Sequence, residues 1–216
     1  MYKWMGAGLL MMGMTGTGLA QDTAAIKLPP PEMAGGKPLM QALQARRSTR
    51  EFGSTALPPQ VLSNLLWVAN GVNRPDSGKR TAPSAHDWRE IDVYVATAEG
   101  VYRYDPPTHT LKHVAAGDIR VLTGVQDFVA SAPVNLVYVA DLDRMSDAGT
   151  EQKARFSAAD AGFIAQNVYR FCAPAGLATV VRGLFDHAVL AQALRLGARQ
   201  QIMLARSVGH PAGNGQ

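Results

Sequence analysis

The sequence is nearly free of cysteine, with Cys172 as the only one among its 216 residues. A single thiol cannot form a disulfide within the chain, so the fold cannot depend on disulfide bonds. The thiol lies in an apolar run over residues 168–172, which favours a packed core residue over a nucleophile.

Charge is also sparse. Charged residues make up 18% of the chain, the formal net charge is only +4, and no long basic run occurs. This pattern gives little support to nucleic-acid binding, and no nucleic-acid partner is predicted. The G-x-S-x-G, H-E-x-x-H, Walker A and G-x-G-x-x-G motifs do not occur, which leaves hydrolases and nucleotide triphosphatases without support. His109 and His113 lack a third ligand at metal-site spacing, so no metal is predicted.

The first twenty residues differ in composition from the rest. Lys3 precedes an uncharged stretch over residues 4–17, and small residues follow up to Ala20. These features predict a secretory signal peptide over residues 1–20, because the apolar stretch is short of the roughly 20 residues that a membrane span needs. Cleavage would give an exported, periplasmic protein with no stable membrane insertion. An uncleaved anchor and a disordered tail remain alternatives.

The remaining chain predicts one domain. Pro29 to Pro31 and the Gly35-Gly36 pair indicate an extended leader over residues 21–37 that is not a folded element. A domain over residues 38–211 and a tail over 212–216 follow. Apolar spacing predicts helices from 38, over 58–71, over 151–173 and over 186–194, and strands over 91–97, 101–104, 111–114, 133–140, 178–182 and 201–208. Residues 72–90 read as a loop and residues 118–130 as mainly helical. This order predicts an α+β fold with a mixed central sheet flanked by helices.

The densest polar cluster follows the first helix. Arg46, Arg47, Ser48 and Arg50 lie within five residues. Guanidiniums form charge-assisted bonds to phosphate, and a hydroxyl adds a neutral donor, so the cluster suits a phosphate group. A solvated basic turn is the alternative.

Two further clusters could line a ligand. Ser84, His86 and Asp87 are hydrogen-bonding residues among small residues in the predicted loop, although a loop histidine is commonly an ordinary surface residue. Arg182 and Gly183 end a predicted strand, where a glycine permits a backbone N–H to point into a site. In the long helix, Gln166 and Asn167 need partners if they are buried, and helix–helix hydrogen bonds would serve equally well.

The order of these pieces resembles the FMN-dependent nitroreductase family, and more closely its SagB-type branch of azoline dehydrogenase-like proteins. The resemblance covers about residues 38–211 and rests on eight short segments: Arg46-Arg47-Ser48-Thr49-Arg50-x-Phe52, Leu65-Leu66-Trp67, Arg80-Thr81-Ala82-Pro83-Ser84, Val101-Tyr102-Arg103-Tyr104-Asp105, Ala132-Pro133-Val134, Gly162-x-x-x-Gln166-Asn167, Gly176-Leu177 and Val208-Gly209-His210-Pro211.

The resemblance implies a nitroreductase-like α+β homodimer with two FMN sites at its interface. It places Arg46, Ser48 and Arg50 at the FMN phosphate and ribityl chain, with Arg47 less certain. It places Ser84, His86 and Asp87 along the ribityl and isoalloxazine, and the backbone of Arg182 and Gly183 at the N5 and O4 edge. The implied reaction is ping-pong hydride transfer through flavin N5 to a small organic acceptor of the nitro, quinone or azoline type. No catalytic acid or base is named, because the cofactor performs the chemistry.

Three departures from the family limit this reading. Ala85-His86-Asp87-Trp88 replaces a Gly-rich and Tyr-Pro stretch, so the substrate preference does not carry over. No basic residue follows Arg206, whereas many nitroreductases have a C-terminal Lys/Arg pair near the phosphate. The predicted signal peptide would separate the protein from NAD(P)H, which leaves the electron donor open. A non-catalytic periplasmic FMN- or partner-binding module is therefore the alternative, and a structural dimer without cofactor is a third.

Overall fold

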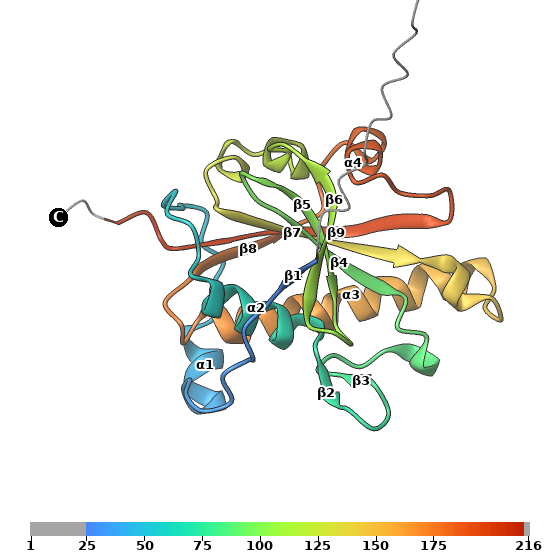
Figure 1. The fold of residues 1–216 in the computed structure, drawn as a ribbon, viewed down its shortest axis with the longest axis horizontal. Helices are drawn as coiled ribbons and strands as arrows, with labels where there is room; N and C mark the ends of the chain where they lie inside the picture. The colour runs from blue at the N-terminus through green and yellow to red at the C-terminus, as the bar shows by residue number, and fades with distance from the viewer. Residues whose placement is uncertain (1–24, 214–216) are drawn as a thin grey trace, which may run out of the picture.

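The computed structural model describes residues 25–213, so the predicted signal peptide and the end of the predicted tail lie outside the described residues. Its centre is a sheet of seven strands in the order β1-β6-β5-β4-β7-β9-β8 (Figure 1). The strands are β1 (Ile26–Lys27), β4 (Ile91–Ala96), β5 (Gly100–Asp105), β6 (Thr110–Ala116), β7 (Val134–Asp141), β8 (Ala178–Arg182) and β9 (Gln200–Gly209). The helices are α1 (Leu39–Ala45), α2 (Pro59–Asn70), α3 (Thr150–Cys172) and α4 (His187–Ala193).

The sheet is antiparallel at each of its pairings, and the prediction of a mixed sheet is wrong in this respect. β7, α3 and β8 form a crossover whose two strands run in the same direction. β9 inserts between them and pairs antiparallel with both. The parallel strands that a βαβ crossover creates are therefore never neighbours.

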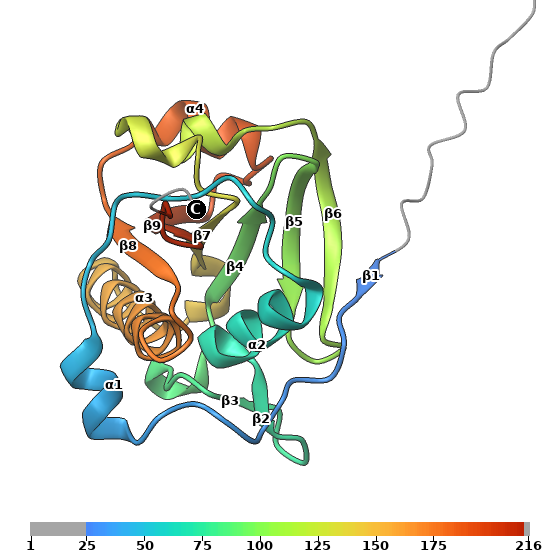
Figure 2. The ribbon, with the colours of Figure 1, turned by 90° about the vertical axis from the view of Figure 1, so that its left-hand side faces the viewer.

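The sheet is the middle of three layers, and elements packed on both of its faces bury it. Along β7, Leu136 and Tyr138 pack in the core beneath α2 and α3, whereas Val137 and Val139 pack with the residues of α4. This alternation follows from the two-residue period of a strand. Figure 2 shows α2 and α3 on one side of the sheet and α4 on the other. The nearly continuous apolar run that predicted a strand buried on both faces is confirmed as β7.

Local signals account for the helix ends. Pro59 occupies the first turn of α2, where the missing N–H would have no partner in the helix. Asp186 Oδ1 accepts the backbone N–H groups of Ala188 and Val189 and caps α4. Gly176 adopts a φ of +68° shortly after α3, a conformation that favours glycine.

Two segments inside the predicted domain differ from the sequence predictions. Residues 72–90 contain a short hairpin of β2 (Val72–Arg74) and β3 (Lys79–Arg80), whose turn needs the positive φ of Gly78. Residues 118–130 form two 3-10 segments, η2 (Arg120–Thr123) and η3 (Asp127–Val129), rather than one helix. They are separated by Gly124, where a Cβ would collide with the Arg182 guanidinium.

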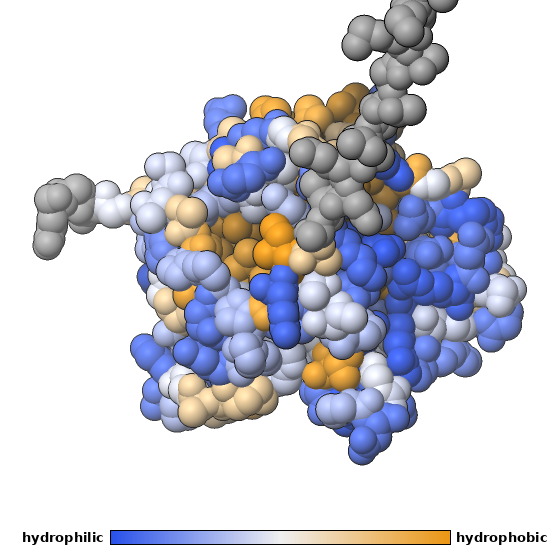
Figure 3. Space-filling model, viewed as in Figure 1, coloured by the Kyte–Doolittle hydropathy of each residue, from blue (hydrophilic) through white to orange (hydrophobic). Residues whose placement is uncertain are grey.

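The leader is extended but belongs to the fold. β1 pairs with β6, and Leu28 is buried in the main core. Its prediction as a segment without a folded element is therefore wrong from residue 25 onward, because the apolar Leu28 side chain finds a core to join. No helix among residues 25–213 is long and apolar enough to cross a membrane. The surface is uneven: on the face seen in Figure 3 the right-hand side is hydrophilic, and a more apolar hollow lies on the left above α2.

Candidate functional site

The basic segment after α1 runs beside the edge strand β8. The backbone N–H of Thr49 donates to Thr179 O at 3.0 Å, and the N–H of Gly53 donates to His210 O at 2.9 Å. Phe52 forms an isolated bridge with Pro211. These contacts fix residues 46–52 against the sheet, so the position of their side chains is set by the fold.

The guanidiniums of Arg46, Arg47 and Arg50 are exposed. None of them forms an ion pair with a carboxylate among residues 25–213. Arg47 and Thr49 line a cavity of about 170 Å³ that β8 closes on one side. Three unpaired guanidiniums beside the Ser48 hydroxyl are suited to an anion with several oxygens.

Tyr169 of α3 lies directly behind this segment. Its hydroxyl is 2.7 Å from Ser48 Oγ and accepts the backbone N–H of Val181 at 3.1 Å. The guanidinium of Arg206 stacks on its ring at 4.0 Å from the centroid, and that of Arg46 lies at 5.4 Å. The basic segment is thereby connected to the core.

Two arginines, Arg182 of β8 and Arg206 of the neighbouring β9, are buried without carboxylate partners among the described residues, on opposite faces of the sheet. Arg206 donates to Thr179 Oγ1 at 3.1 Å and to Ala165 O at 2.7 Å. Arg182 donates to Thr123 O, to Asn135 Oδ1 and to Ser207 Oγ. Burial lowers the pKa of Arg182 to about 10, so it remains charged at neutral pH.

The predicted loop residues form a second cluster. η1 (Ala85–Asp87) carries His86 and Asp87 at φ values of +50° and +57°, and Arg89 follows at +52°. Such left-handed conformations are costly for residues other than glycine and persist where surrounding contacts impose them. His86 is exposed and stacks on Trp88 at 4.4 Å between ring centroids.

Buried carboxyls hold that loop. Ser84 Oγ donates to Glu90 Oε2 at 3.2 Å and accepts the Arg89 N–H at 2.8 Å, while Asp160 of α3 accepts the Ala85 N–H at 2.9 Å. Glu90 is 0% exposed and Asp160 2% exposed. Burial, reinforced by the neighbouring Asp160 charge, raises the pKa of Glu90 to about 7. Its Oε1 is buried without a hydrogen-bond partner among the described residues.

The two clusters lie at different levels of α3. Tyr169 contacts the basic segment and Asp160 contacts the loop. Nine residues of helix separate these two contacts, a rise of about 14 Å at 1.5 Å per residue. Ser84 and Asp87 line a separate cavity of about 320 Å³. One chain therefore does not bring residues 46–50 and 84–87 together around a single cavity.

The remaining predicted residues differ in exposure. Gly183 is exposed after β8, whereas the Arg182 side chain is buried, so near Gly183 only the backbone of Arg182 could face a ligand. Gln166 is exposed and Asn167 half-buried. Cys172 is fully buried, and burial raises the pKa of its thiol to about 12, which confirms the prediction of a core residue. Among residues 25–213 no group of three potential metal ligands gathers.

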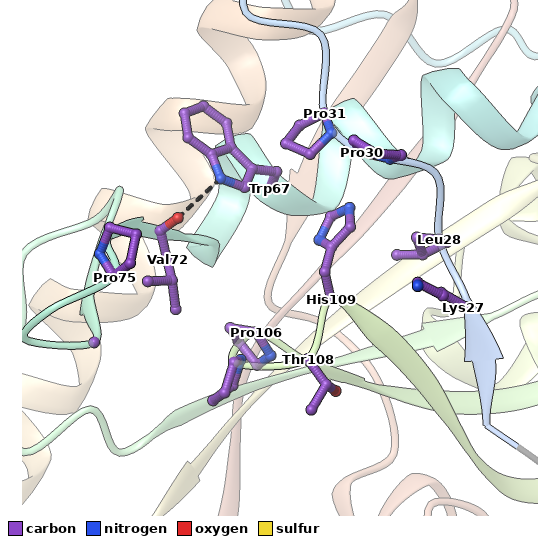
Figure 4. Close-up of a pocket in the computed structure, with 12 residues that line it drawn as sticks. Lys27, Leu28, Pro30, Pro31, Trp67, Val72, Pro75, Pro106, Thr108 and His109 are labelled. Carbon is purple, nitrogen blue, oxygen red and sulfur yellow. Dashed lines mark hydrogen bonds between the residues drawn. The ribbon is translucent and has the colours of Figure 1, made fainter.

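A larger cavity of about 500 Å³ lies elsewhere, between the leader, α2 and the turn from β5 to β6 (Figure 4). Prolines dominate its lining, and Trp67 and His109 are its aromatic residues. Trp67 Nε1 donates to Val72 O, and both ring nitrogens of His109 bond to protein groups. Since the polar atoms of these rings are engaged within the chain, the cavity offers few free groups for ligand recognition.

The family model of the nitroreductase family matches residues 43–210. The chain belongs to the nitroreductase family. A nitroreductase relative from Methanocaldococcus jannaschii is 32% identical over 174 residues, covering 76% of this chain and 86% of that protein. The crystal structure of a nitroreductase relative from Ralstonia eutropha has 45% identity and a TM-score of 0.85, covering 96% of this chain and 97% of that one.

A nitroreductase-type protein from Desulfovibrio desulfuricans, solved in complex with FMN, shares the fold. Its TM-score is 0.60 at 23% identity, and the match covers 84% of this chain and 91% of that one. The nitroreductase-like fold prediction is confirmed, and the family supports an FMN-dependent oxidoreductase.

Sequence reasoning missed Tyr169, Arg206, Glu90 and Asp160. A signal existed for Asp160, which lies four residues from Ile164 on the apolar face of α3, where a charged residue must find partners. No comparable signal pointed to Tyr169, because an aromatic residue on a buried helix face is ordinary core composition.

Proposed function

We propose that this nitroreductase-family chain is an exported FMN-dependent oxidoreductase of the SagB-type branch, acting on a small organic acceptor. The observation that carries the proposal is the set of three exposed guanidiniums without ion pairs among the described residues, fixed beside β8 with Ser48. This donor set fits the doubly charged phosphate of FMN. The wall beside it includes small residues, Gly176, Ala178 and Thr179, which leave space for a ligand.

In this proposal Arg46, Ser48 and Arg50 hold the phosphate and the ribityl chain, and Arg47 adds charge at the cavity mouth. The backbone at Gly183 faces the reactive edge of the ring system. FMN, when bound, supplies hydride transfer at N5, and the protein contributes binding, orientation and electrostatics. The positive charges of the buried Arg182 and Arg206 side chains add to the positive electrostatic potential near this segment, which favours a bound anion.

A homodimer completes the proposed site. The loop cluster and the basic segment of one chain lie about 14 Å apart along α3 and open to separate cavities. Ser84, His86 and Asp87 of one chain would therefore face the cofactor held by Arg46 and Ser48 of the other. Exposed apolar side chains on α1, namely Leu39, Met40 and Leu43, are a candidate for the contact between the chains.

The test starts from the mature chain purified after incubation with FMN. A yellow protein with flavin absorbance is expected, and a colourless one would contradict the proposal. The double variant Arg46→Ala/Arg50→Ala should lose FMN, because it removes two of the three charges. Arg155→Ala is the matched control, since Arg155 is an exposed arginine of α3 in a weak pair with Glu151 at 4.0 Å, and it should retain FMN.

A non-catalytic FMN- or partner-binding module is the second candidate. The predicted signal peptide favours it, since export would remove the chain from NAD(P)H. It predicts bound FMN that neither NADH nor NADPH reduces, and no turnover with quinones or nitroaromatics. Rapid bleaching of the flavin absorbance by either nucleotide would argue for the oxidoreductase instead.

A further inference from the structure

The hydroxyl of Tyr169 has a defined hydrogen-bond direction. It accepts the N–H of Val181 at 3.1 Å and lies 2.7 Å from Ser48 Oγ. A phenol carries one hydrogen. If Ser48 were the donor, the phenol hydrogen would need another acceptor, and the described residues provide none within bonding distance. Tyr169 is only 8% exposed, so an unpaired hydrogen there would be costly. Tyr169 therefore donates to Ser48.

The direction of this hydrogen bond determines where the hydroxyl hydrogen of Ser48 can point. Because its oxygen accepts the Tyr169 hydrogen, its own hydrogen must point elsewhere, and Ser48 is exposed on the outer side. The neighbouring Arg46, Arg47 and Arg50 are exposed on the same segment. The hydroxyl is thus oriented as a donor toward the side on which an anion would bind.

The Tyr169 ring is held from behind. Arg206 stacks on it at 4.0 Å and is itself fixed by Thr179 Oγ1 and Ala165 O, with 0% exposure. A stacked guanidinium in a buried position restricts tilting of the ring. Arg206 comes from β9, Ser48 from the segment after α1 and Tyr169 from α3, so three distant parts of the chain meet at the Tyr169 side chain.

We propose that Tyr169 is a positioning residue that orients the Ser48 hydroxyl toward the phosphate of the cofactor, with Arg206 as its support. The inference rests on the proposed function. Its consequence is selectivity: the Tyr169–Ser48 pair favours the phosphorylated flavin FMN over riboflavin, which lacks the phosphate. Tyr169 does not contact the flavin ring in this proposal.

The experiment measures the dissociation constants of FMN and riboflavin by quenching of flavin fluorescence, for the wild type, Tyr169→Phe, Ser48→Ala and the double variant. Tyr169→Phe should weaken FMN binding by about tenfold, the size expected for a hydrogen bond to a charged group. Riboflavin binding should change by less than about twofold. The double variant should match Ser48→Ala, because the tyrosine acts only through the serine.

Tyr138→Phe is the matched control. Tyr138 is fully buried in the same core, and its hydroxyl has no hydrogen-bond partner among the described residues, so its removal should leave both constants unchanged. If Tyr169→Phe does not fold, the same two dissociation constants are measured for Arg206→Lys. It keeps the charge but loses the planar stacking, and it should reduce the preference for FMN.

The outcomes separate the two proposals. A wild type that binds neither flavin overturns the proposed function and this inference together. A wild type that binds FMN, with a Tyr169→Phe variant that binds it equally well, overturns this inference alone. Equal weakening of FMN binding and riboflavin binding would assign Tyr169 a structural role only. Additive losses of FMN affinity in the double variant would show that Tyr169 does not act through Ser48.

Discussion

The protein buries two pairs of like-charged residues, one of arginines and one of carboxyls, and the two pairs differ in how burial affects their protonation. Arg182 of β8 and Arg206 of β9 are buried, and each is bonded to neutral oxygens. Beneath the loop after β3, Glu90 and Asp160 lie close together, and the pKa of Glu90 rises to about 7. A guanidinium spreads its charge over five donors, whereas a buried carboxyl can gain a proton instead. Arg182, whose pKa is about 10, is therefore insensitive to pH near neutrality, and the acidic group is sensitive.

The largest effect is expected at Arg182. Arg182→Ala would leave Thr123 O and Ser207 Oγ without their guanidinium donor and would open a cavity, so stability should fall by about 3–5 kcal/mol. Urea unfolding followed by circular dichroism measures this. Arg155→Ala, on the exposed face of α3, should cost less than about 0.5 kcal/mol. A loss below about 1 kcal/mol at Arg182 would mean that its hydrogen bonds contribute little net stability.

The second effect is the pH dependence of the acidic group. The folded state binds the Glu90 proton more tightly than the unfolded chain, whose carboxyl has a pKa of 4.5. Stability from this group is therefore full below pH 4.5 and is lost as the pH rises to about 7, by about 3 kcal/mol. Asp160 from α3 strengthens the effect and Arg144 opposes it.

Urea midpoints at pH 5 and pH 8 test this difference. Glu90→Gln should remove most of the slope, because glutamine does not titrate and retains an acceptor for Ser84. Glu151→Gln, a change at an exposed carboxyl of α3, should leave the slope unchanged. An equal slope in the wild type and Glu90→Gln would show that Glu90 is ionised throughout this range.

A smaller effect is expected at Ser84, which connects the loop to Glu90. Ser84→Ala removes the bond to Glu90 Oε2 and leaves the Arg89 N–H without its acceptor. A loss of about 1–2 kcal/mol is expected, together with faster hydrogen exchange at Arg89. Unchanged hydrogen exchange at that amide would indicate that the left-handed backbone conformation of the loop does not depend on the Ser84 hydrogen bonds.

The smallest effect is expected at Tyr138. Its hydroxyl is buried without a partner among the described residues, so Tyr138→Phe should change stability by less than about 0.5 kcal/mol or increase it. A clear loss in thermal denaturation would reveal a hydrogen bond to bound water.

Local patterns determined the elements themselves. α2 and α3 were predictable from apolar residues at helical spacing, β4 from its alternation and β7 from its apolar run. The cluster of Arg46, Ser48 and Arg50 was visible as a candidate anion site because its members are close together in sequence. The hairpin of β2 and β3 was missed because its strands are only two and three residues long, too short to show a period.

The sequence by itself determined an α+β chain and predicted a phosphate-binding segment, since periodicity and neighbouring charges act over a few residues. Only the tertiary structure placed β9 between β7 and β8 and Tyr169 behind Ser48, 121 positions away in the chain. The tertiary structure also brought Asp160 within 2.9 Å of the amide of Ala85. These contacts depend on how α3 packs across the sheet, and burial there acts together with residue type to shift the pKa values of the groups.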